Sequence, residues 1–537
     1  MKQQILPTNL SAFLASCEAC ETIQDAVLLD ILCSAQSSRF GQEHEFEKIT
    51  HYADFVSAVS PQDWESLKPY VDAVVNGEKD QLFEGEPDYF ICTSGTTSAM
   101  KMMPESARGR AVKSLTTQLR VEAMSRYAST MLTGKILPLV NNAIEGYTEK
   151  GIAYGSASGI ALATASEALR DQIAFPVEVL DAGYSDALDY LILRFVVESD
   201  VRAVFGNNAG RVEQLFLRAE KEAEQLINDI ENGTITLKTP IPEPLMKTLV
   251  EKCTPNPMRA AELRVAWKKA GRFLPEVYWP QFQIMACWLA GSVGRYVDAL
   301  RPLLASSVSF FDVGYGATEG KFNLPLEPEQ PAGPLCLYGA FYEFRSLGKE
   351  SFLRAHELQD GKQYELFVTT YSGLYRYAIH DVLRVDGFTG NTPRIVFEYK
   401  AGEILNISGE KVAAASLLPV VAEVMGKELL HWCVVGDTNQ KQYLFCLEFA
   451  HLPDAPQQVV NAYAERLEKA LVEQTHIYPI FREQKLIRSV GVKIMKSGWR
   501  AALYADRTRE GQSQVQVKLP LVYSAVPHPE YSVAENQ

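Results

Sequence analysis

The chain has 537 residues, of which 47% are hydrophobic, and its formal net charge is −14. This length predicts two or three structural units with large cores, and the negative charge argues against a nucleic-acid-binding protein, which would need a basic surface. The amino-terminal residues lack the apolar segment of a signal peptide, and no apolar run reaches the about 18 residues of a membrane span. We therefore expect a cytoplasmic protein that binds neither nucleic acid nor a membrane.

Nine cysteines are scattered along the chain. Cys17 and Cys20 form the one Cys-x-x-Cys pair, but a second pair and a nearby histidine, which a zinc site would need, are missing from the sequence. Apolar residues at helical spacing around the pair favour a buried helix face instead. This cysteine usage is typical of a protein from a reducing compartment.

The predicted elements begin with helices over residues 8–75. Asn9 can cap the first of them, and the Ser60–Glu65 stretch can start another with Pro61 at its first helical position. From residue 88 on, strands alternate with helices, which indicates α/β architecture. Strands are predicted at 88–92, 135–140, 200–208, 279–289, 308–313, 341–344 and 364–370. Helices are predicted at 105–130, within 190–230 and at 295–304, and loops at 151–165 and 238–257.

The chain becomes richer in strands beyond Asp381. Strands are predicted at 383–385, 394–398, 432–435, 443–449 and 514–520, and helices at 412–425 and 459–473. This pattern predicts a carboxyl-terminal α+β module of about 130 residues, an ordinary size for a domain. We place the boundary so that residues 1–408 form an amino-terminal domain and residues 409–537 form a carboxyl-terminal domain.

The Thr93–Pro104 stretch follows the predicted strand 88–92 and surrounds Gly95 with hydroxyl side chains. Hydroxyls and backbone N–H groups of such a loop can turn onto phosphate oxygens, and glycine permits the positive φ that this needs. Lys101 adds a positive charge at the far end. The stretch lacks the Gly-Lys-Ser/Thr ending of a P-loop. A hydroxyl-rich turn before a helix is the other interpretation, and the loop alone does not decide between them.

Two later stretches favour the nucleotide interpretation, Gly314–Gly320 and Tyr371–Val382. In this order and at these separations, the three stretches resemble the nucleotide-binding motifs of acyl-adenylate-forming enzymes. More narrowly, they are similar to those of the plant auxin-responsive Gretchen Hagen family of acyl acid–amido synthetases and its bacterial relatives. The Tyr-Arg-Tyr-x-x-x-Asp-Val run that begins at Tyr375 is peculiar to that family. The resemblance extends from about Leu29 to Pro520.

The resemblance implies a large amino-terminal adenylate-forming α/β domain, with mixed β-sheets and flanking helices, and a small mobile α+β carboxyl-terminal domain that acts as a lid. It implies an enzyme that uses ATP and Mg²⁺ to adenylate a small carboxylic acid and then transfers the acyl group to an amine. No carrier domain with a phosphopantetheine serine is recognisable, which favours an amino acid as the acceptor. Trp288, Val293 and Tyr154 suggest an apolar or aromatic acid. Family members are mostly monomeric.

The resemblance also implies site residues. Asp381 would bind the ribose hydroxyls, Thr318 would contact the α-phosphate or the adenylate, and Glu319 would bind a magnesium ion. Glu319 would act as a catalytic residue together with Lys411 and Lys518. The expected nucleotide-binding residues are Ser94, Gly95, Thr96, Thr97, Tyr315, Gly316, Ala317, Thr318, Phe341 and Asp381, with Tyr315 and Phe341 around the adenine.

Other interpretations of these residues stay open. A helix N-cap followed by a first-turn acid would also explain Thr318 and Glu319, a structural ion pair would explain Arg376, and aromatic residues such as Phe341 can simply fill a core. The chain departs from the family pattern in a shorter phosphate stretch at Ser98–Ala99 and in His380, where the family usually has glycine. These departures support one rival function, an inactive homologue that binds a small molecule. A second rival is an adenylating ligase with coenzyme A or a hydroxyl group as acceptor.

Overall fold

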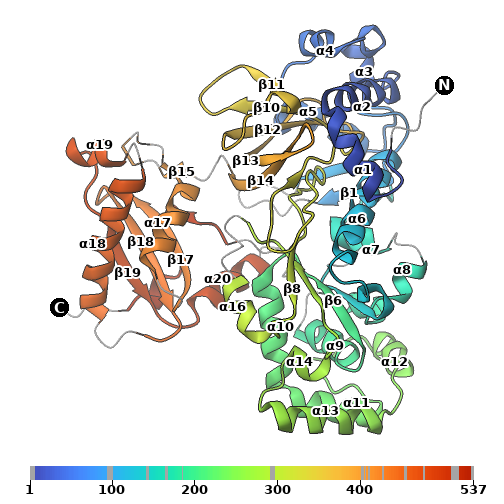
Figure 1. Cartoon of the computed structure of the whole chain (residues 1–537), viewed down its shortest axis with the longest axis vertical. Coiled ribbons are helices and arrows are strands. Elements are labelled where there is room, and N and C mark those ends of the chain that lie inside the picture. Colours follow the sequence, from blue (N-terminus) through green and yellow to red (C-terminus); the bar gives the residue numbers. More distant parts are fainter. Residues whose placement is uncertain are drawn as a thin grey trace. The chain divides into compact units, whose positions relative to one another are not determined.

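The computed structural model describes residues 6–92, 101–140, 144–163, 167–183, 186–290, 297–400, 404–405, 407–408, 410, 412–425, 428–452, 456–475, 478–509 and 519–533. The chain divides into two compact units (Figure 1). The first unit comprises residues 1–379 and 383–397, and the second comprises residues 380–382 and 398–537.

The first unit begins with the predicted helices, α1 (Leu10–Ser16), α2 (Cys20–Ser34), α3 (Arg39–Glu43), α4 (Tyr52–Ala58) and α5 (Trp64–Val75). Asn9 caps α1 as expected, because its side chain accepts a hydrogen bond from the Ala12 amide at 2.9 Å. The cap of α5 differs from the prediction. Asp63 accepts from the Ser66 amide, and the helix begins at Trp64, so that Pro61 lies before it.

The predicted phosphate stretch joins two antiparallel strands, β1 (Tyr89–Cys92) and β2 (Met102–Glu105), and its last three residues belong to β2. These strands form a sheet in the order β2-β1-β5-β4 with β4 (Gly146–Tyr147) and β5 (Ala153–Gly155). The helix predicted at 105–130 is α6 (Ala107–Ser125), which directly follows β2. Residues 151–165 are not the predicted loop, because they contain β5 and α7 (Ala157–Ala163); alanine favours the helix there. Helix α8 (Glu167–Asp171) follows.

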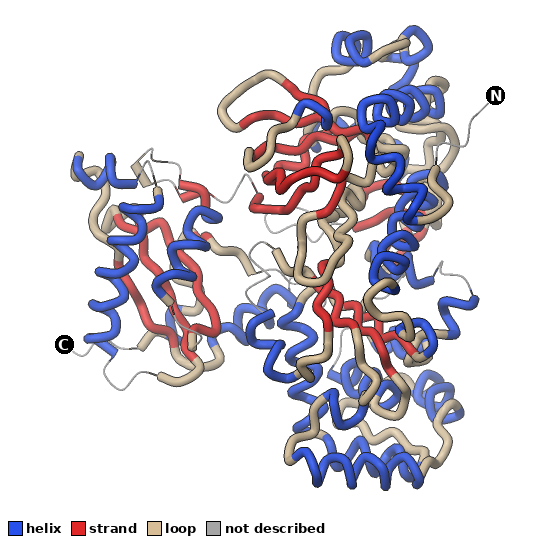
Figure 2. Tube along the Cα trace, viewed as in Figure 1, coloured by secondary structure: helices blue, strands red, loops and turns tan. Residues whose placement is uncertain are grey.

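A parallel sheet of the first unit has the order β3-β6-β7-β8, from β3 (Lys135–Pro138), β6 (Val201–Phe205), β7 (Ile284–Cys287) and β8 (Ser309–Asp312). All four residues of β7 are buried, as expected for a parallel sheet with both faces covered. Figure 2 shows helices around these strands. They are α9 (Asp186–Val196), α10 (Ala209–Lys221), α11 (Ala223–Asn232), α12 (Glu243–Glu251), α13 (Pro257–Ala270), α14 (Pro275–Tyr278) and α16 (Val297–Leu300). Helix α12 corrects the predicted loop at 238–257, since Pro242 and Pro244 lie at its start, where proline is tolerated.

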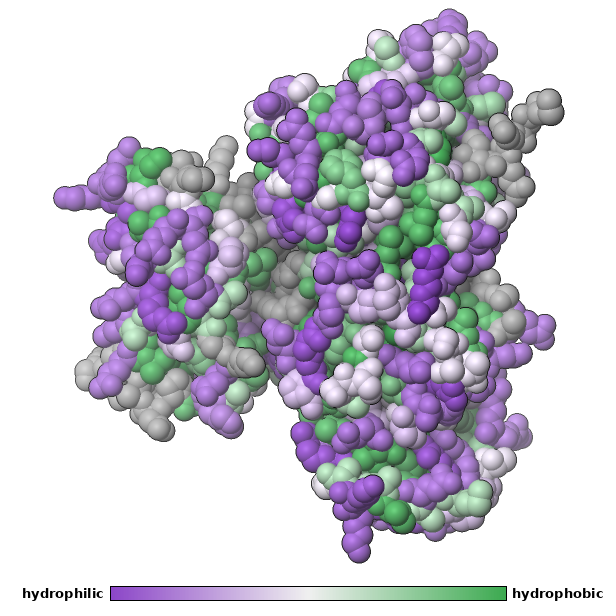
Figure 3. All heavy atoms as spheres, viewed as in Figure 1, coloured by the Kyte–Doolittle hydropathy of each residue, from purple (hydrophilic) through white to green (hydrophobic). Residues whose placement is uncertain are grey.

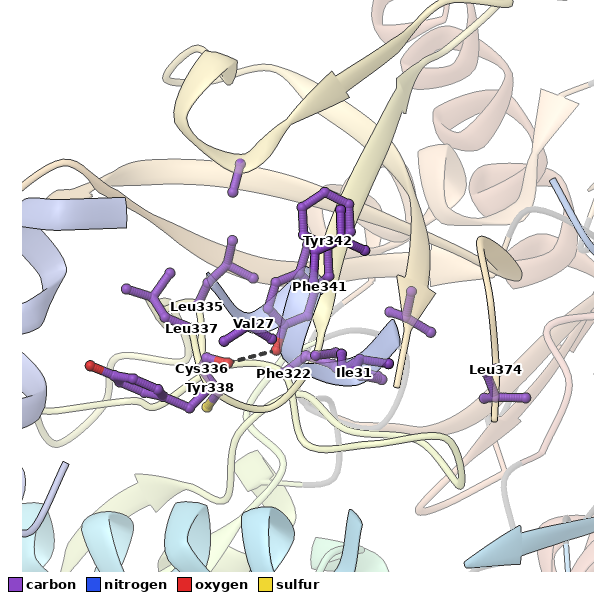
Figure 4. Packing of buried hydrophobic residues seen from close by; sticks show 14 of the residues in the cluster. Val27, Ile31, Phe322, Leu335, Cys336, Leu337, Tyr338, Phe341, Tyr342 and Leu374 are labelled. Atoms are coloured by element: carbon purple, nitrogen blue, oxygen red, sulfur yellow. Dashed lines mark hydrogen bonds between the residues drawn. The ribbon is translucent and has the colours of Figure 1, made fainter. Parts of the chain in front are cut away.

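A larger sheet has the order β11-β10-β12-β13-β14-β9. Its strands are β9 (Gly333–Pro334), β10 (Phe341–Ser346), β11 (Phe352–Arg354), β12 (Gln363–Thr369), β13 (Tyr377–Thr389) and β14 (Thr392–Lys400). It shares a core with α2, whose Val27 and Ile31 belong to the cluster in Figure 4. The Tyr342 hydroxyl donates to the Cys336 carbonyl at 2.9 Å within this cluster. The core therefore places the predicted third motif, which enters β13, on a packed scaffold.

The second unit is an α+β unit, as predicted. Its sheet has the order β19-β18-β17-β20, from β17 (Leu429–Asp437), β18 (Gln442–Phe449), β19 (Gly491–Met495) and β20 (Val522–Tyr523). The helices are α17 (Leu417–Val424), α18 (Pro456–Gln474), α19 (Tyr478–Glu483) and α20 (Trp499–Arg509), and a small ribbon joins β15 (Ile404–Leu405) to β16 (Val412–Ala413). Most of the strand predicted at 514–520 lies outside the described residues. Short 3₁₀ turns of both units span Cys17–Ala19, Phe46–Lys48, Met131–Thr133, Val177–Ala182, Arg301–Leu303, Ala355–Glu357, Ala414–Ser416 and Pro529–Tyr531.

All nine cysteines lie in the described part of the chain, and all are free thiols. Cys17 and Cys20 are buried in the core of the first unit, which confirms the helix-face interpretation over the zinc site. Burial raises the pKa of both thiols to about 11. The face of the molecule in Figure 3 carries hydrophilic and hydrophobic residues side by side. Within the described ranges, no helix combines the length and the apolar character that crossing a membrane requires.

Candidate active site

A tight turn carries Thr318 and Glu319 beyond the carboxyl end of β8. The Ala317 amide donates to the Gly320 carbonyl at 2.9 Å, and the Gly320 amide donates back at 3.3 Å. The two residues thus lie at the tip of the turn, and both are partly exposed, as are Gly316 and Ala317. No helix begins here, so the N-cap interpretation of Thr318 and Glu319 is wrong. The turn presents a carboxylate and a hydroxyl where parallel α/β sheets bind ligands.

Asp312, the last residue of β8, fixes the chain that leads to this turn. Its carboxylate accepts hydrogen bonds from the amides of Leu289 at 2.7 Å and Gly314 at 2.6 Å. Burial raises the pKa of Asp312 to about 6, and the two backbone donors act in the opposite direction. Gly314 has a φ of +81°, and a side chain there would meet Arg120 and Asn323 within about 3 Å, so this position requires glycine.

Three basic side chains surround the base of the turn, and no local sequence pattern predicted them. The Lys113 ammonium, on α6, donates to the Thr318 carbonyl at 3.1 Å and to the Glu105 carboxylate at 2.6 Å. Lys321 donates to the Thr117 hydroxyl at 2.6 Å. Desolvation, together with the positive charges of Arg120 and Lys113, lowers the pKa of Lys321 to about 7. Burial also lowers the pKa of Arg120, which reaches toward Gly314.

Arg376, in the third motif, forms a structural ion pair. Its guanidinium donates to both carboxylate oxygens of Glu343, with the shortest contact at 2.8 Å, and to the Val59 carbonyl at 2.8 Å. Both side chains of the pair are buried, and Tyr52 donates a further hydrogen bond to Glu343 at 2.8 Å. Arg376 therefore has a structural role as one partner of a buried salt bridge.

Asp381 follows on β13 and is 7% exposed. The Lys400 ammonium lies 3.6 Å from its carboxylate. His380 is exposed and has a φ of +62°, a conformation that glycine adopts without strain. This backbone geometry gives a physical reason for a family preference for glycine at this position.

Tyr315 and Phe341, the two aromatic residues predicted to bind the adenine, lie in different surroundings. Phe341 is 1% exposed and packs in the core with the rings of Tyr52 and Phe55, and Figure 4 shows it among core side chains. A ring that stacks on adenine needs an open face, so the structure does not support Phe341 as a nucleotide-binding residue. Tyr315 stacks on Phe397 with centroids 5.6 Å apart.

Several predicted residues lie outside the described part of the chain: Ser94, Gly95, Thr96, Thr97, Ser98, Ala99, Val293, Lys411 and Lys518. Two residues close to these in the sequence, Lys101 and Glu410, lie in the described part of the chain. The Lys101 ammonium lies over the Trp64 ring, 5.2 Å from its centroid. Glu410, which precedes Lys411, accepts from the Ile407 and Ser408 amides at 2.7 Å each and from the Tyr443 hydroxyl at 3.0 Å.

The donor set at the turn fits magnesium. Mg²⁺ is usually held by one or two carboxylates together with substrate phosphates and water, and not by a protein cage. Glu319 provides one carboxylate at a partly exposed position, and in the described ranges no cluster of three His, Cys, Asp or Glu side chains forms a cage. The arrangement can therefore bind a phosphate-bound cation at the turn tip.

The chain is similar in sequence to known proteins. Residues 9–308 match the GH3 family N-terminal domain, residues 333–400 the central domain, and residues 416–526 the C-terminal domain. Indole-3-acetic acid-amido synthetase GH3.10 of Arabidopsis thaliana is 25% identical over 69% of this chain and 68% of its own. GH3.4, of the same name and organism, is 22% identical over 94% and 90%.

Among solved structures, GH3.15 acyl acid amido synthetase superposes with a TM-score of 0.84 at 20% identity, over 98% of this chain and 97% of its own. This likeness confirms the predicted fold class. The three domain matches together cover most of the sequence. The chain therefore belongs to the GH3 family.

Proposed function

We propose that the chain is an ATP-dependent acyl acid–amido synthetase. It joins a small carboxylic acid to AMP, releases pyrophosphate, and transfers the acyl group to an amino acid. The observation that carries this proposal is the Thr318–Glu319 turn at the carboxyl end of β8, in a chain that belongs to a family with relatives named as amido synthetases. Cytoplasmic location, a monomeric state and bacterial origin are part of the proposal.

In both half-reactions, the protein mainly positions the reacting groups and stabilises the charge that develops on them. First, an oxygen of the acid attacks the α-phosphorus, and the bond to pyrophosphate breaks with its electron pair. Then the amine nitrogen attacks the acyl carbon, AMP leaves with the electron pair of the mixed anhydride, and the nitrogen loses a proton to solvent. We assign both steps to an ATP and acid site in residues 1–408 and a lid in residues 409–537.

Each remaining candidate residue has one role in this proposal. Ser94–Thr97 bind the β- and γ-phosphates, Thr318 with Tyr315, Gly316 and Ala317 contacts the adenylate, and Asp381 accepts the ribose hydroxyls. Glu319 holds Mg²⁺, which neutralises phosphate charge when bound. Lys411 and Lys518 neutralise charge on the leaving group.

An apolar or aromatic acid fits Trp288, which lies next to the turn, and Tyr154. Trp288 is partly exposed, and its indole N–H donates to the Gly314 carbonyl at 3.3 Å, directly before Tyr315. Tyr154, on β5, is partly exposed as well. Flat apolar side chains of this kind favour an acid with a ring or a hydrocarbon chain.

The test is pyrophosphate release from ATP and Mg²⁺ with aryl, indolyl and fatty acids, with and without mixed amino acids. Release that needs an acid and increases with an amino acid is the expected result. Glu319→Ala and Asp381→Ala should each lower the rate at least about tenfold, the effect of losing one charge-assisted contact. Lys68→Met is the matched control, because Lys68 forms an exposed pair with Asp72. Wild-type rates in both site variants would contradict the site assignment.

A rival enzyme would transfer the acyl group to a different acceptor. Acid-dependent release that coenzyme A stimulates, and amino acids do not, would identify a thioester-forming ligase. ATP binding without release in the presence of any acid would indicate an inactive homologue.

A further inference from the structure

The start of α6 joins all three predicted nucleotide motifs. Strand β2, which leaves the phosphate stretch, ends at Glu105. Ser106 caps α6 and donates from its hydroxyl to the Tyr371 carbonyl at 2.9 Å, and its amide donates to the Ser372 hydroxyl at 3.2 Å. Lys113, two turns further along α6, reaches the carbonyl of Thr318. This connection spans 205 residues of sequence.

The Lys113 ammonium contacts the peptide that precedes Glu319. The carbonyl that accepts its hydrogen bond belongs to Thr318, so this peptide group is rigidly bonded to the Glu319 amide nitrogen. The two hydrogen bonds of the turn itself join Ala317 and Gly320 and do not involve the Thr318 carbonyl. Lys113 therefore restrains the tip of the turn from outside it.

Glu105 fixes the position of the Lys113 ammonium. The side chain of Glu105 is 2% exposed and that of Lys113 is 20% exposed, and their charged atoms are 2.6 Å apart. The second oxygen of Glu105 is buried without a hydrogen-bond partner, so the carboxylate depends on Lys113 for its stabilisation. The ammonium is thus anchored on one side and directed at the turn on the other.

We propose that Lys113 is a positioning residue, which holds the turn that carries Glu319 in place against the end of β2 and the start of α6 through the Glu105–Lys113–Thr318 connection. Magnesium tolerates little distortion of its octahedral ligands, so a small displacement of one carboxylate weakens binding. The proposal rests on the proposed function in one respect, the assignment of Glu319 to magnesium. It goes beyond that function by assigning a role to a lysine that need not touch substrate.

The experiment measures ATP binding by calorimetry as a function of MgCl₂ concentration, which requires no turnover. In Lys113→Met, the MgCl₂ concentration for half-maximal binding should increase about tenfold, the effect of losing one charge-assisted hydrogen bond. In Lys113→Arg it should stay within about threefold, because a guanidinium can make both contacts. Lys68→Met serves as the control for loss of a lysine charge.

A second pair of variants separates positioning from simple neutralisation of a buried charge. Glu105→Gln keeps Lys113 and an amide oxygen that can still accept its hydrogen bond, so it should raise the MgCl₂ concentration for half-maximal binding less than Lys113→Met does. Lys113→Met/Glu105→Gln should retain the full defect of Lys113→Met. The double variant also avoids an uncompensated carboxylate, which alone can prevent folding. A double variant with the wild-type magnesium dependence would overturn the proposal.

Failure of this proposal can be told apart from failure of the proposed function. Wild-type protein that binds ATP with magnesium, but releases no pyrophosphate with any acid, contradicts the synthetase activity and still allows the binding comparison. Wild-type protein whose ATP binding does not depend on magnesium overturns the role of Lys113 directly.

Discussion

At the scale of single residues, the Arg376–Glu343 pair shows what a buried charge requires. Arg376 has a φ of +46° and is enclosed with a carboxylate that also accepts from Tyr52. Two charges taken out of water are stable only when their hydrogen bonds are complete, and removing one partner leaves the other uncompensated. The pair thus holds the segment that leads into β13, five residues before Asp381.

We predict that Glu343→Gln lowers the free energy of unfolding by about 3–5 kcal/mol, the range for breaking a buried ion pair. The matched control is Glu220→Gln. Arg272 donates two hydrogen bonds to Glu220 as well, but this pair is largely exposed, and its loss should cost at most about 1 kcal/mol. Urea unfolding of both variants measures the difference. Equal losses in the two would contradict the structural role of the pair.

At the scale of elements, the contact between α6 and the third motif depends on a glycine. A Cβ atom at Gly109 would lie 2.1 Å from the Ser372 hydroxyl oxygen and 2.9 Å from a Glu105 oxygen. The first turn of α6 can approach Tyr371–Ser372 closely because this position has no side chain. The same close approach lets Ser106 contact both residues.

Gly109→Ala should therefore destabilise the protein by about 1–3 kcal/mol, the range for overpacking. In an unconstrained helix the same change stabilises by about 0.5–1 kcal/mol, so that the sign is diagnostic. Ser372→Ala removes the clashing oxygen, and the double variant should be more stable than Gly109→Ala. Urea unfolding of the two single variants and the double variant provides the measurement. If Gly109→Ala stabilised the protein, the contact with Ser372 would have to relax without a loss of free energy of unfolding, which would contradict this prediction.

Local sequence signals predicted most of the helices and strands. They predicted a smaller share of the contacts around the candidate site. Strand β7 is a short apolar run, and Asn9 is a capping residue whose hydrogen bond lies within the first turn of α1. The predictions failed where a local signal is ambiguous, as in the proline-containing start of α12. Lys113 carries no local signal at all, because its partner Thr318 is brought to it by the fold. The sequence left two interpretations of Phe341 open, because an aromatic residue in a strand fits a core and a ligand site equally well, and the structure places it in a core.

At the scale of the whole molecule, each unit has hydrophobic cores of its own. Phe216 belongs to a core of the first unit and Phe445 to a core of the second, and both are fully buried. Units that each bury their own apolar residues can unfold as separate cooperative blocks.

We expect calorimetry to resolve two thermal transitions. Phe445→Ala should lower the midpoint of one and Phe216→Ala that of the other, because deleting a buried phenylalanine costs about 3–5 kcal/mol in the unit that contains it. Each variant serves as the control for the other. A single transition that both variants shift alike would show that the units unfold as one block.

The cysteines described above differ in how open they are to thiol chemistry. Cys33 is exposed near the end of α2, whereas six others are buried and Cys92 and Cys253 are half-buried. Burial raises the pKa of Cys92 to about 12 and also raises that of Cys253, and the reactive species is the thiolate. The unaltered protein therefore carries one favoured attachment point for a maleimide dye, from which distances to a labelled nucleotide can be followed by energy transfer.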